Sequence, residues 1–584
     1  MDCSSSRPRL KRFPSDAPLL GDSSFTQLKT RRNTRRTTTA LLSFLLLSAL
    51  LALPALRQAS VPFFLDPLVE EKKAEAGAKS EKVVGEWSQE DQRLREYRWI
   101  TPPVHASLKA FVDFLPPAQR KTREWLARTR AVSLAGTGIG LGADDPPRKI
   151  QPGEAGRKHR EDPVEGEGPG LFFGGSRRKY LDLVQEWKTG RPVEACEKGR
   201  WEDEYKRMHD EMMSGEREPW LLEFVCHKDG VCGGIADRML GMVSTFLYAI
   251  LSGRAFSLRW EQPAPVDLIF DSPYIDWSRS FTPSSPNLLP YTNKTVIASH
   301  DSLQQHDWPD FLLDNFFPSF PSAYGAGKEP YWVSLDINRG VVFRSFYYDA
   351  VKPRLEELGL QMSTAYSCLT SFLLRPKPAI LKFITQYTSF FSLPENYVVG
   401  LQIRTGDSSM LNGGFDTSNV TDYDNYFTCA SQLARRYAHP SQRIIYFLLT
   451  DSKALQADAL RAYPDRVIVT GLEASHDELG NLGQRGFDVV KRALDGYART
   501  VAESYIFAGT DAQILTFRSG FGKIPTWLRG KDETTVQLFN PHLDPEMTES
   551  IKAAYGGTLP PSPDCSTPNA IKPMSHLALD WSLG

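Results

Sequence analysis

The sequence lacks several patterns that would point directly to a chemistry. Its 584 residues contain no Cys-x-x-Cys pair, no Gly-x-Ser-x-Gly elbow and no Walker phosphate loop. These absences argue against a clustered-cysteine zinc site, an α/β-hydrolase and a P-loop nucleotidase. Charge of one sign is lacking too, since 69 Lys and Arg stand against 70 Asp and Glu. Because nucleic-acid binding usually needs a basic face, we expect no nucleic-acid partner.

The start of the chain is where charge is unevenly placed. Residues 1–39 carry nine Lys or Arg and three Asp, and Thr37–Leu56 is uncharged and rich in Leu and Ala. About 20 apolar residues span a bilayer of about 30 Å, and basic residues on the amino side keep that end in the cytosol. We therefore expect a cytosolic tail over residues 1–36, a transmembrane helix over residues 37–56 and a luminal catalytic part, as in a type II Golgi protein. A cleaved signal peptide is the alternative, but its leader and apolar core are usually shorter.

Cysteine is scarce, and its placement fits that compartment. Cys3 lies on the expected cytosolic side, which leaves six cysteines on the luminal side. An even number suits disulfides in an oxidising lumen, although six cysteines allow 15 pairings and the sequence does not choose among them. Two N-glycosylation sequons, at Asn293 and Asn419, agree with the same location. The luminal cysteines are Cys196, Cys226, Cys232, Cys368, Cys429 and Cys565.

The luminal part changes character near Tyr180. Residues 57–180 are rich in Pro, Gly and charge, so they bury too little apolar surface to order themselves, and we expect a largely disordered stem with short helices around 83–98 and 107–130. Beyond it, strands and amphipathic helices alternate over about 400 residues, which is too long for one ordinary core. The predicted fold is α/β with two lobes. Their expected bounds are residues 181–393 and 394–557, and residues 558–584 form a C-terminal tail.

In the first lobe, a glycine turn precedes an apolar helix. The sequence Gly233-Gly234-Ile235-Ala236-Asp237-Arg238 leads into apolar residues whose spacing fits one buried helix face, up to Leu251. A glycine turn before a helix exposes backbone N–H groups that favour anions. An ordinary tight turn before a core helix explains the spacing equally well.

The second lobe repeats one arrangement three times, with an apolar strand that ends in polar or small residues. If the three strands are parallel neighbours, their ends meet in one crevice, where ligands of open α/β sheets bind. An arginine at such an end can hold two phosphate oxygens. The strands and their ends are Val398–Ile403 before Arg404 and Asp407, Ile444–Leu449 before Asp451, and Ala512–Phe517 before Ser519, Gly520 and Phe521.

A long helix, expected over Phe487–Ala508, carries Glu503 near its carboxyl end. A negative charge there opposes the helix dipole, which suggests a role other than helix stability. The alternative is a solvated surface glutamate, which is the usual place for this residue type.

Taken in order, three regions resemble the GDP-fucose-dependent fucosyltransferases, most closely the plant xyloglucan-type branch. The regions are Cys232 to Leu251, Gly400 to Arg404, and Glu503 with Asp511 and Ser519-Gly520-Phe521-Gly522, within roughly residues 220–530. The resemblance implies a GT-B fold of two Rossmann-like lobes, inversion at the sugar carbon, a glycan acceptor, a GDP-fucose donor and no required metal or cofactor.

The resemblance also implies roles for particular residues. Arg404 would clamp the β-phosphate, Glu503 would pair with the guanine edge, and Ser519, Gly520 and Phe521 would present donors to the phosphates. These roles suit the chemistry, because a metal-free transfer must offset the diphosphate charge with Arg and N–H groups, and guanine offers N1–H and N2–H₂ to a carboxylate. The remaining expected donor-site residues are Gly233, Gly234, Asp237, Arg238, Gln402 and Asp451.

Some residues depart from the family pattern or leave roles open. Asp237 places an acid where an amide is usual, and Gly520 stands where Thr is commoner. The catalytic base is open between Asp407 and Asp237. The pair Asp422 and Asp424 forms a DxD pattern typical of metal-dependent transferases, but it follows a loop and not a strand. A GT-B transferase with another nucleotide sugar and a non-catalytic glycan-binding relative remain alternatives.

Overall fold

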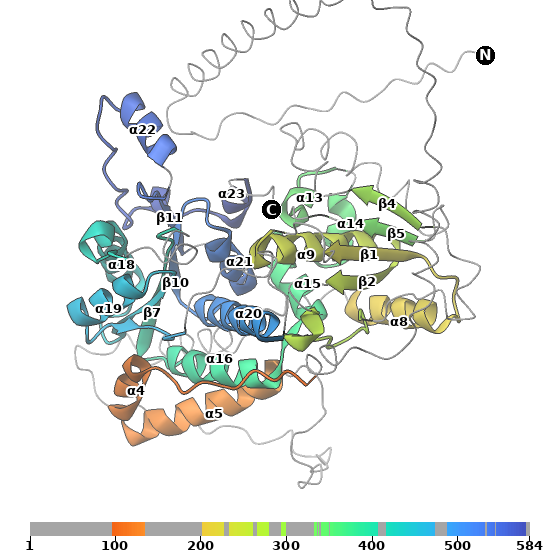
Figure 1. Cartoon of the computed structure of the whole chain (residues 1–584), viewed down its shortest axis with the longest axis horizontal. Helices are drawn as coiled ribbons and strands as arrows, with labels where there is room; N and C mark the ends of the chain where they lie inside the picture. The colour runs from red at the N-terminus through yellow and green to blue at the C-terminus, as the bar shows by residue number, and fades with distance from the viewer. Residues whose placement is uncertain are drawn as a thin grey trace, which may run out of the picture. The chain divides into compact units, whose positions relative to one another are not determined.

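A computed structural model describes most of the chain from residue 96 onward (Figure 1). The predicted transmembrane helix, residues 37–56, and Asp407 lie outside the described residues. The chain divides into two compact units, one of Ser88–Pro545 with Pro561–Gly584 and one of Met1–Trp87 with Glu546–Pro560. In the second unit the structure describes most of helix α22 (Pro545–Ala554). The described residues are 96–134, 201–226, 233–260, 265–278, 294–298, 332–335, 337, 340–349, 351–406, 416–472, 487–531, 534–543 and 545–579.

The amino-terminal half of the larger unit forms a parallel sheet that packs on a buried helix. Its strands are β1 (Leu221–Cys226), β2 (Ala255–Trp260), β4 (Lys294–Ala298) and β5 (Trp332–Leu335), and the helix is α9 (Ile235–Ser252). The strand order is β2-β1-β5-β4, and every pairing is parallel. Among the described residues α9 is the helix long and apolar enough to cross a membrane, yet 78% of it is buried, so it is a core helix. It ends at Gly253, where φ is 63°.

The carboxyl-terminal half forms a second parallel sheet, with the order β11-β10-β7-β8-β9. Helices cover both faces: α18 and α19 pack on one, and α16, α20 and α21 on the other. Because helices cover both faces of this sheet, β7 is buried throughout, and its sequence is a mostly apolar run. The bounds are β7 (Asn396–Ile403), β8 (Arg443–Thr450), β9 (Val467–Ile468), β10 (Ala512–Thr516), β11 (Thr535–Leu538), α16 (Pro378–Phe391), α18 (Asp424–Tyr437), α19 (Lys453–Ala462), α20 (Phe487–Ala508) and α21 (Gly520–Arg529).

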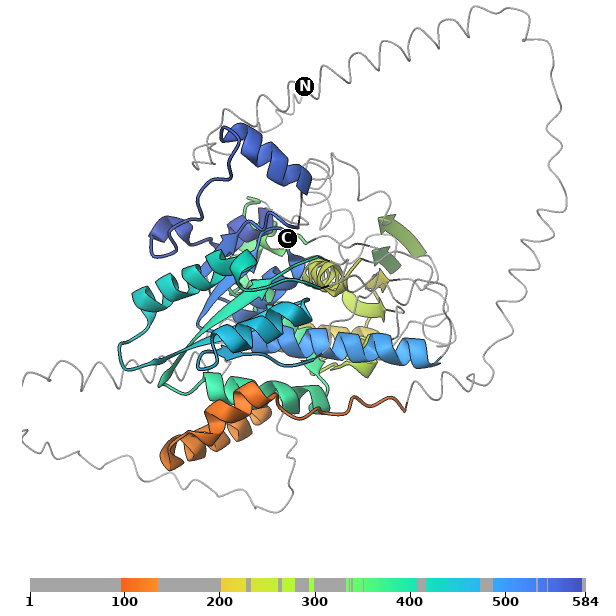
Figure 2. The ribbon, with the colours of Figure 1, turned by 60° about the vertical axis from the view of Figure 1, so that its left-hand side comes forward.

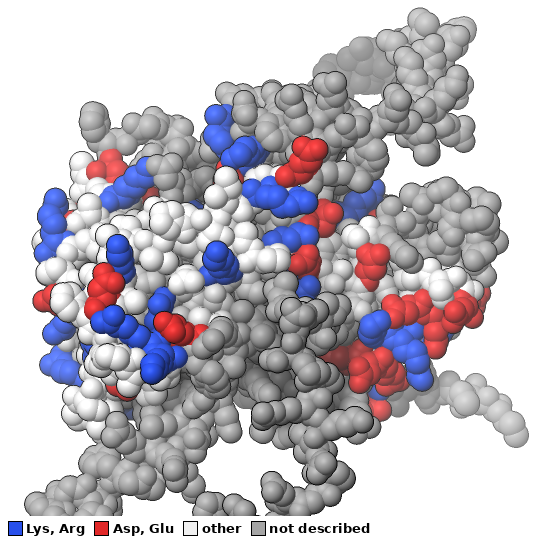
Figure 3. All heavy atoms as spheres, turned by 90° about the horizontal axis from the view of Figure 1, so that it is seen from below, with Lys and Arg blue, Asp and Glu red and all other residues white. Residues whose placement is uncertain are grey.

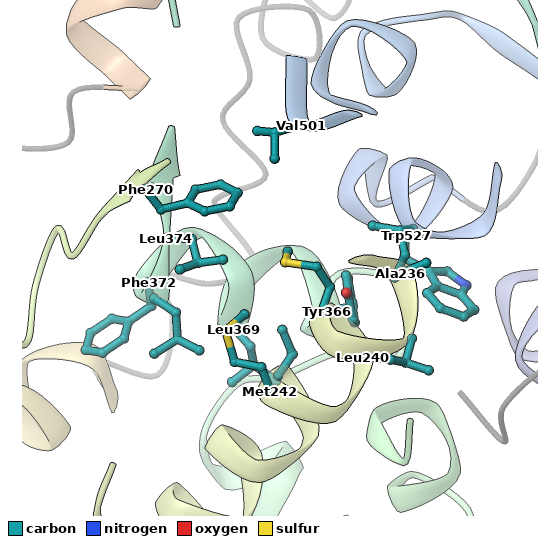
Figure 4. Packing of buried hydrophobic residues seen from close by; sticks show 14 of the residues in the cluster. Ala236, Leu240, Met242, Phe270, Tyr366, Leu369, Phe372, Leu374, Val501 and Trp527 are labelled. Carbon is teal, nitrogen blue, oxygen red and sulfur yellow. The ribbon is translucent and has the colours of Figure 1, made fainter. Parts of the chain in front are cut away.

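One apolar core joins the helices that lie between the two sheets. Figure 4 shows side chains of α9 and α21 beside those of α15 (Ala365–Leu373), and Val501 of α20 near Phe270. The ring centroids of Trp527 and Tyr366 are 5.5 Å apart. The two sheets fall on either side of the lobe boundary expected after residue 393. The other elements of this unit are α8 (Trp201–Ser214), α13 (Val342–Ser345), α14 (Lys352–Glu357) and the antiparallel pair β3 (Phe270–Asp271) with β6 (Arg375–Pro376).

Part of the expected stem belongs to the folded unit. Helices α4 (Ala106–Asp113) and α5 (Pro117–Leu134) lie beside α16 in both Figure 1 and Figure 2. Arg123 Nη2 donates to the Gln386 carbonyl at 3.0 Å, and Leu108 is fully buried. Helices α4 and α5 lie where a short helix was expected around residues 107–130, and the described part of this segment buries apolar side chains on α16 in place of forming a core of its own.

The expected C-terminal tail is also part of the fold. A disulfide joins Cys565 to Cys429 on α18. Helix α23 (Met574–Leu579) then packs against α13 and α21, with Met574 and Leu577 buried. Cys226 and Cys368 are disulfide-bonded as well. These bonds agree with the oxidising compartment expected from the cysteine count.

Charges of both signs lie on the face in Figure 3, and acidic side chains gather over α8. The first turn of α8 holds Glu202, Asp203 and Glu204. Carboxylates at this end complement the helix dipole. The acidic cluster therefore has a structural explanation.

We expect removal of the Cys429–Cys565 disulfide to destabilise the fold. The bond spans 136 residues of chain, so it restricts the unfolded state strongly, and its loss should cost about 2–5 kcal/mol. Urea unfolding of the double variant Cys429→Ser, Cys565→Ser should show it, with Cys3→Ser as the matched control. An unchanged urea midpoint would contradict this expectation.

Candidate active site

Polar side chains meet at the carboxyl ends of β7 and β8, as expected for parallel neighbours. Arg404 follows β7 and Asp451 follows β8, and Arg404 Nη1 lies 3.1 Å from Asp451 Oδ2. The Asp451 side chain is 5% exposed, whereas that of Arg404 is 26% exposed. The ion pair therefore orients a guanidinium that can still reach a ligand from solvent.

Asp451 also fixes the turn that follows Arg404. Its Oδ1 accepts from the Thr405 backbone N–H at 2.8 Å and from the Thr405 hydroxyl at 2.9 Å, and its Oδ2 accepts from the Gly406 N–H at 3.2 Å. Gly406 has a φ of 121°, which favours glycine. The Asp451 carboxylate thus binds the backbone that follows β7, which orients Arg404, and its contact with the donor stays a prediction.

A second network links β7 to β10 and to the start of α21. Gln402 Nε2 donates to Ser519 Oγ at 3.0 Å, and Thr516 N donates to Gln402 Oε1 at 3.0 Å. The Arg404 N–H donates to Thr516 Oγ1 at 3.0 Å. Gln402 therefore holds Ser519 beside the strand end that carries Arg404, and its amide is engaged within the protein.

The N-terminus of α21 is brought to the same edge of the sheet. Ser519 is the residue before the helix, and Gly520 and Phe521 begin it. The first N–H groups of a helix have no partner within it and carry partial positive charge, so they favour anions. A Cβ at Gly522 would lie 2.6 Å from Gln402 Oε1, so only glycine lets α21 approach β7 this closely.

The glycine turn before α9 is held by its own neighbours. Asp237 Oδ2 accepts from the Gly234 N–H at 3.2 Å, and Gly233 has a φ of 73°. Arg238 Nε donates to the Gly233 carbonyl at 2.9 Å, and its guanidinium lies 5.5 Å from the Trp260 ring centroid. The acid at Asp237 is thus a helix cap, and its charge offsets the positive end that would attract an anion.

Glu503 is buried within the protein, so the alternative of a solvated surface residue is wrong. Only 3% of it is exposed, and its Oε2 accepts from Arg499 Nε at 2.9 Å. Its Oε1 accepts from the Thr470 hydroxyl, just beyond β9. The pairing with Arg499 and Thr470 explains how a carboxylate is tolerated near the carboxyl end of α20.

Sequence reasoning missed residues that support this edge. Asn540 Nδ2, beyond β11, donates to the Arg404 carbonyl at 2.6 Å. Tyr426 OH lies 3.0 Å from Thr516 Oγ1, and burial raises the pKa of this tyrosine, which keeps the hydroxyl protonated. The strand-end rule that found Arg404 would have found Asn540, whereas Tyr426 lies on a helix and gave no such signal.

The DxD pair serves local structure. Asp422 Oδ2 accepts from Asn419 Nδ2 at 2.7 Å, and Asp424 Oδ2 accepts from the Thr428 hydroxyl at 3.3 Å. Both aspartates lie at the start of α18 and its preceding 3₁₀ turn. Negative charge at that end stabilises the helix.

An apolar cavity of about 20 Å³ lies between α9, α20 and α21. Ile235 and Phe521 line it, and each adjoins one of the two glycine turns. Ala236, Phe270 and Val501, labelled in Figure 4, also line it. Its volume suits one methyl-sized group, and its apolar lining disfavours water.

No protein-family model matches the sequence, and no curated protein matches it. Among solved structures, a substituted form of Arabidopsis thaliana FUT1 in complex with GDP matches with 16% identity and a TM-score of 0.40, over 63% of this chain and 82% of that one. The chain is similar to fucosyltransferases. NodZ α-1,6-fucosyltransferase with GDP matches at 15% identity and a TM-score of 0.32, over 53% and 92% of the two chains. NodZ from Bradyrhizobium matches at 14% and 0.30, over 53% and 93%.

We expect Asp451→Asn to loosen the anion site. The amide cannot accept from the Thr405 and Gly406 N–H groups and pair with Arg404 at once, so about 1–3 kcal/mol of stabilisation is lost. The variant should bind inorganic pyrophosphate about tenfold or more weakly in calorimetric titration. Glu357→Gln, which alters an exposed ion pair with Arg354 on α14, is the control, and equal pyrophosphate affinity in both variants would contradict the role.

Proposed function

We propose that this protein is a glycosyltransferase that moves fucose from GDP-fucose to a glycan, with inversion and without a metal. The observation that carries the proposal is Arg404, held by Asp451 beside the N-terminus of α21. A departing diphosphate gains negative charge, and a fixed guanidinium together with the backbone N–H groups at the start of α21 offsets that charge where it develops. Ser519 adds a hydroxyl to the same edge.

Guanine recognition is proposed for Glu503. A carboxylate has about four acceptor positions, and Arg499 and Thr470 take one each. The positions left can accept the N1–H and N2–H₂ groups of guanine. Burial strengthens such a contact, because competing water is excluded.

A deoxysugar fits the apolar cavity. Fucose carries a methyl group where most hexoses carry a hydroxymethyl, and the cavity is of methyl size. Phe521, which lines it, is two residues from Ser519, whose hydroxyl contacts Gln402. The methyl subsite would then lie next to the diphosphate site.

The proposal extends to architecture and location. The two parallel sheets support a GT-B arrangement with the donor on the carboxyl-terminal lobe. The disulfides and the basic tail before residues 37–56 support a type II protein of the Golgi membrane. Asp407 remains the proposed base, since Asp237 is engaged as a helix cap.

A GT-B transferase that uses another nucleotide sugar is the second candidate. The observation that favours it is the pairing of Glu503 with Arg499, which could be structural alone. Selective binding of GDP over UDP and ADP, in the presence of EDTA, favours the fucosyltransferase; preference for UDP favours the second candidate.

We expect Arg404→Ala to fold and to lose transfer by about 10²–10³-fold in kcat, by analogy with loss of one oxyanion-hole donor. Arg404→Lys should recover part of the rate, because lysine keeps the positive charge. The recovery should be incomplete, because lysine cannot make the two parallel hydrogen bonds of a guanidinium. Arg461→Ala, on the exposed face of α19, is the control. Unchanged turnover in Arg404→Ala would exclude the phosphate role.

We expect Ala236→Val to fill the cavity and to raise KM for GDP-fucose while binding of GDP stays unchanged.

The wild type should also use GDP-fucose about tenfold or more better than GDP-L-galactose, its 6-hydroxy analogue, because burying an unpaired hydroxyl costs about 1–3 kcal/mol. Steady-state kinetics with both donors test this. Equal use of the two donors by the wild type would show that the cavity does not take the methyl group.

A further inference from the structure

Residues 96–134, which we call the strap, pack along α16 and contact the residues that follow the carboxyl end of β9. Tyr97 OH donates to Asp495 Oδ1 on α20 at 2.9 Å, and Thr101 Oγ1 donates to the Ala379 carbonyl on α16 at 3.0 Å. Figure 2 shows the strap running beside α16. These contacts fix the strap at one end, far in sequence from the elements it touches.

At the start of α4 the strap contacts the residue that follows β9. The Val469 N–H donates to Ser107 Oγ at 3.2 Å, and the Ser107 hydroxyl lies 3.5 Å from the Val469 carbonyl. The His105 N–H donates to Tyr387 OH at 3.1 Å, and that hydroxyl also lies 3.5 Å from the Val469 carbonyl. Ser107 Oγ therefore holds the Val469 N–H, and the Tyr387 hydroxyl lies beside the carbonyl of the same residue.

His105 contacts the next part of that turn. Gly471 has a φ of 68°, and a Cβ there would lie 2.5 Å from His105 Cδ2, so the imidazole packs directly on the glycine. His105 Nδ1 accepts from the Ser107 N–H at 3.1 Å, and burial lowers the pKa of His105, which keeps it a neutral acceptor. Histidine and serine thus present one rigid surface to the turn.

Thr470 lies between the two held residues and donates to Glu503. Its hydroxyl also accepts from the Leu472 N–H at 3.3 Å. Glu503 is close enough to raise the pKa of Tyr387, although burial is the larger cause. Val469, Thr470 and Gly471 are consecutive, so the strap sets the position of the hydroxyl that orients the carboxylate.

We propose that Ser107 and His105 are positioning residues for nucleotide-base recognition: the strap fixes the Val469–Leu472 turn, and Thr470 in that turn orients Glu503 toward the base. The inference rests on the proposed function, in which Glu503 binds guanine. It assigns to a segment amino-terminal to both sheets a part in donor selectivity.

The test compares the binding of GDP and IDP to the full-length protein. IDP lacks the N2–H₂ group, so the ratio of its Kd to that of GDP reports the carboxylate contact. Ser107→Ala should reduce the ratio about five- to tenfold and raise KM for the donor, with kcat at saturation nearly unchanged. Ser107→Thr keeps the hydroxyl and should retain the ratio. Thr101→Ala, which removes a strap contact away from the turn, is the matched control.

Glu503→Gln separates the two levels of the proposal. If Glu503→Gln lowers the ratio and Ser107→Ala does not, the base contact stands and the strap inference is overturned. If Glu503→Gln leaves the ratio unchanged, the base contact fails and the inference fails with it. Should Ser107→Ala fail to fold, Tyr387→Phe removes the other hydroxyl that holds Val469, and an unchanged ratio in that variant overturns the inference.

Discussion

Burial of β7 on both faces and along both edges is the constraint on which the rest of this structure depends. Neighbouring strands satisfy its backbone, and helices cover its two faces, so polar chemistry can emerge only at its carboxyl end. Arg404 stands at that point. Asp451, at the end of the adjacent strand, gives it a partner and shapes the turn that follows.

The N-termini of α21 and α9 differ in charge. The start of α21 carries no acid in its first turn, whereas that of α9 is capped by Asp237. An anion therefore gains more from α21 than from α9. Between them lies an apolar cavity, so charged and apolar parts of one donor molecule can be accommodated side by side.

Many of the strands and helices were predictable, because apolar spacing and strand-end residues are local features of the sequence. The strand-end rule placed Arg404 and Asp451 together, and spacing gave α9 and α20 with their approximate bounds. The packing of the strap and of the C-terminal segment onto the fold was not predicted, for one shared reason. Each has too few apolar residues to form a core alone, and each buries them on surfaces that other parts of the chain supply.

By itself the sequence determined the α/β class, the apolar strands with polar ends and the arginine at the end of β7, because these follow from periodicity and from short motifs. Tertiary structure decided what each polar residue does. Asp451 accepts a hydrogen bond from the Gly406 N–H, and Gln402 donates one to Ser519. Asp237 caps its own helix, and Glu503 pairs with Arg499 and Thr470. Such roles depend on which groups lie within hydrogen-bond distance across segments far apart in sequence, and no local pattern records that distance.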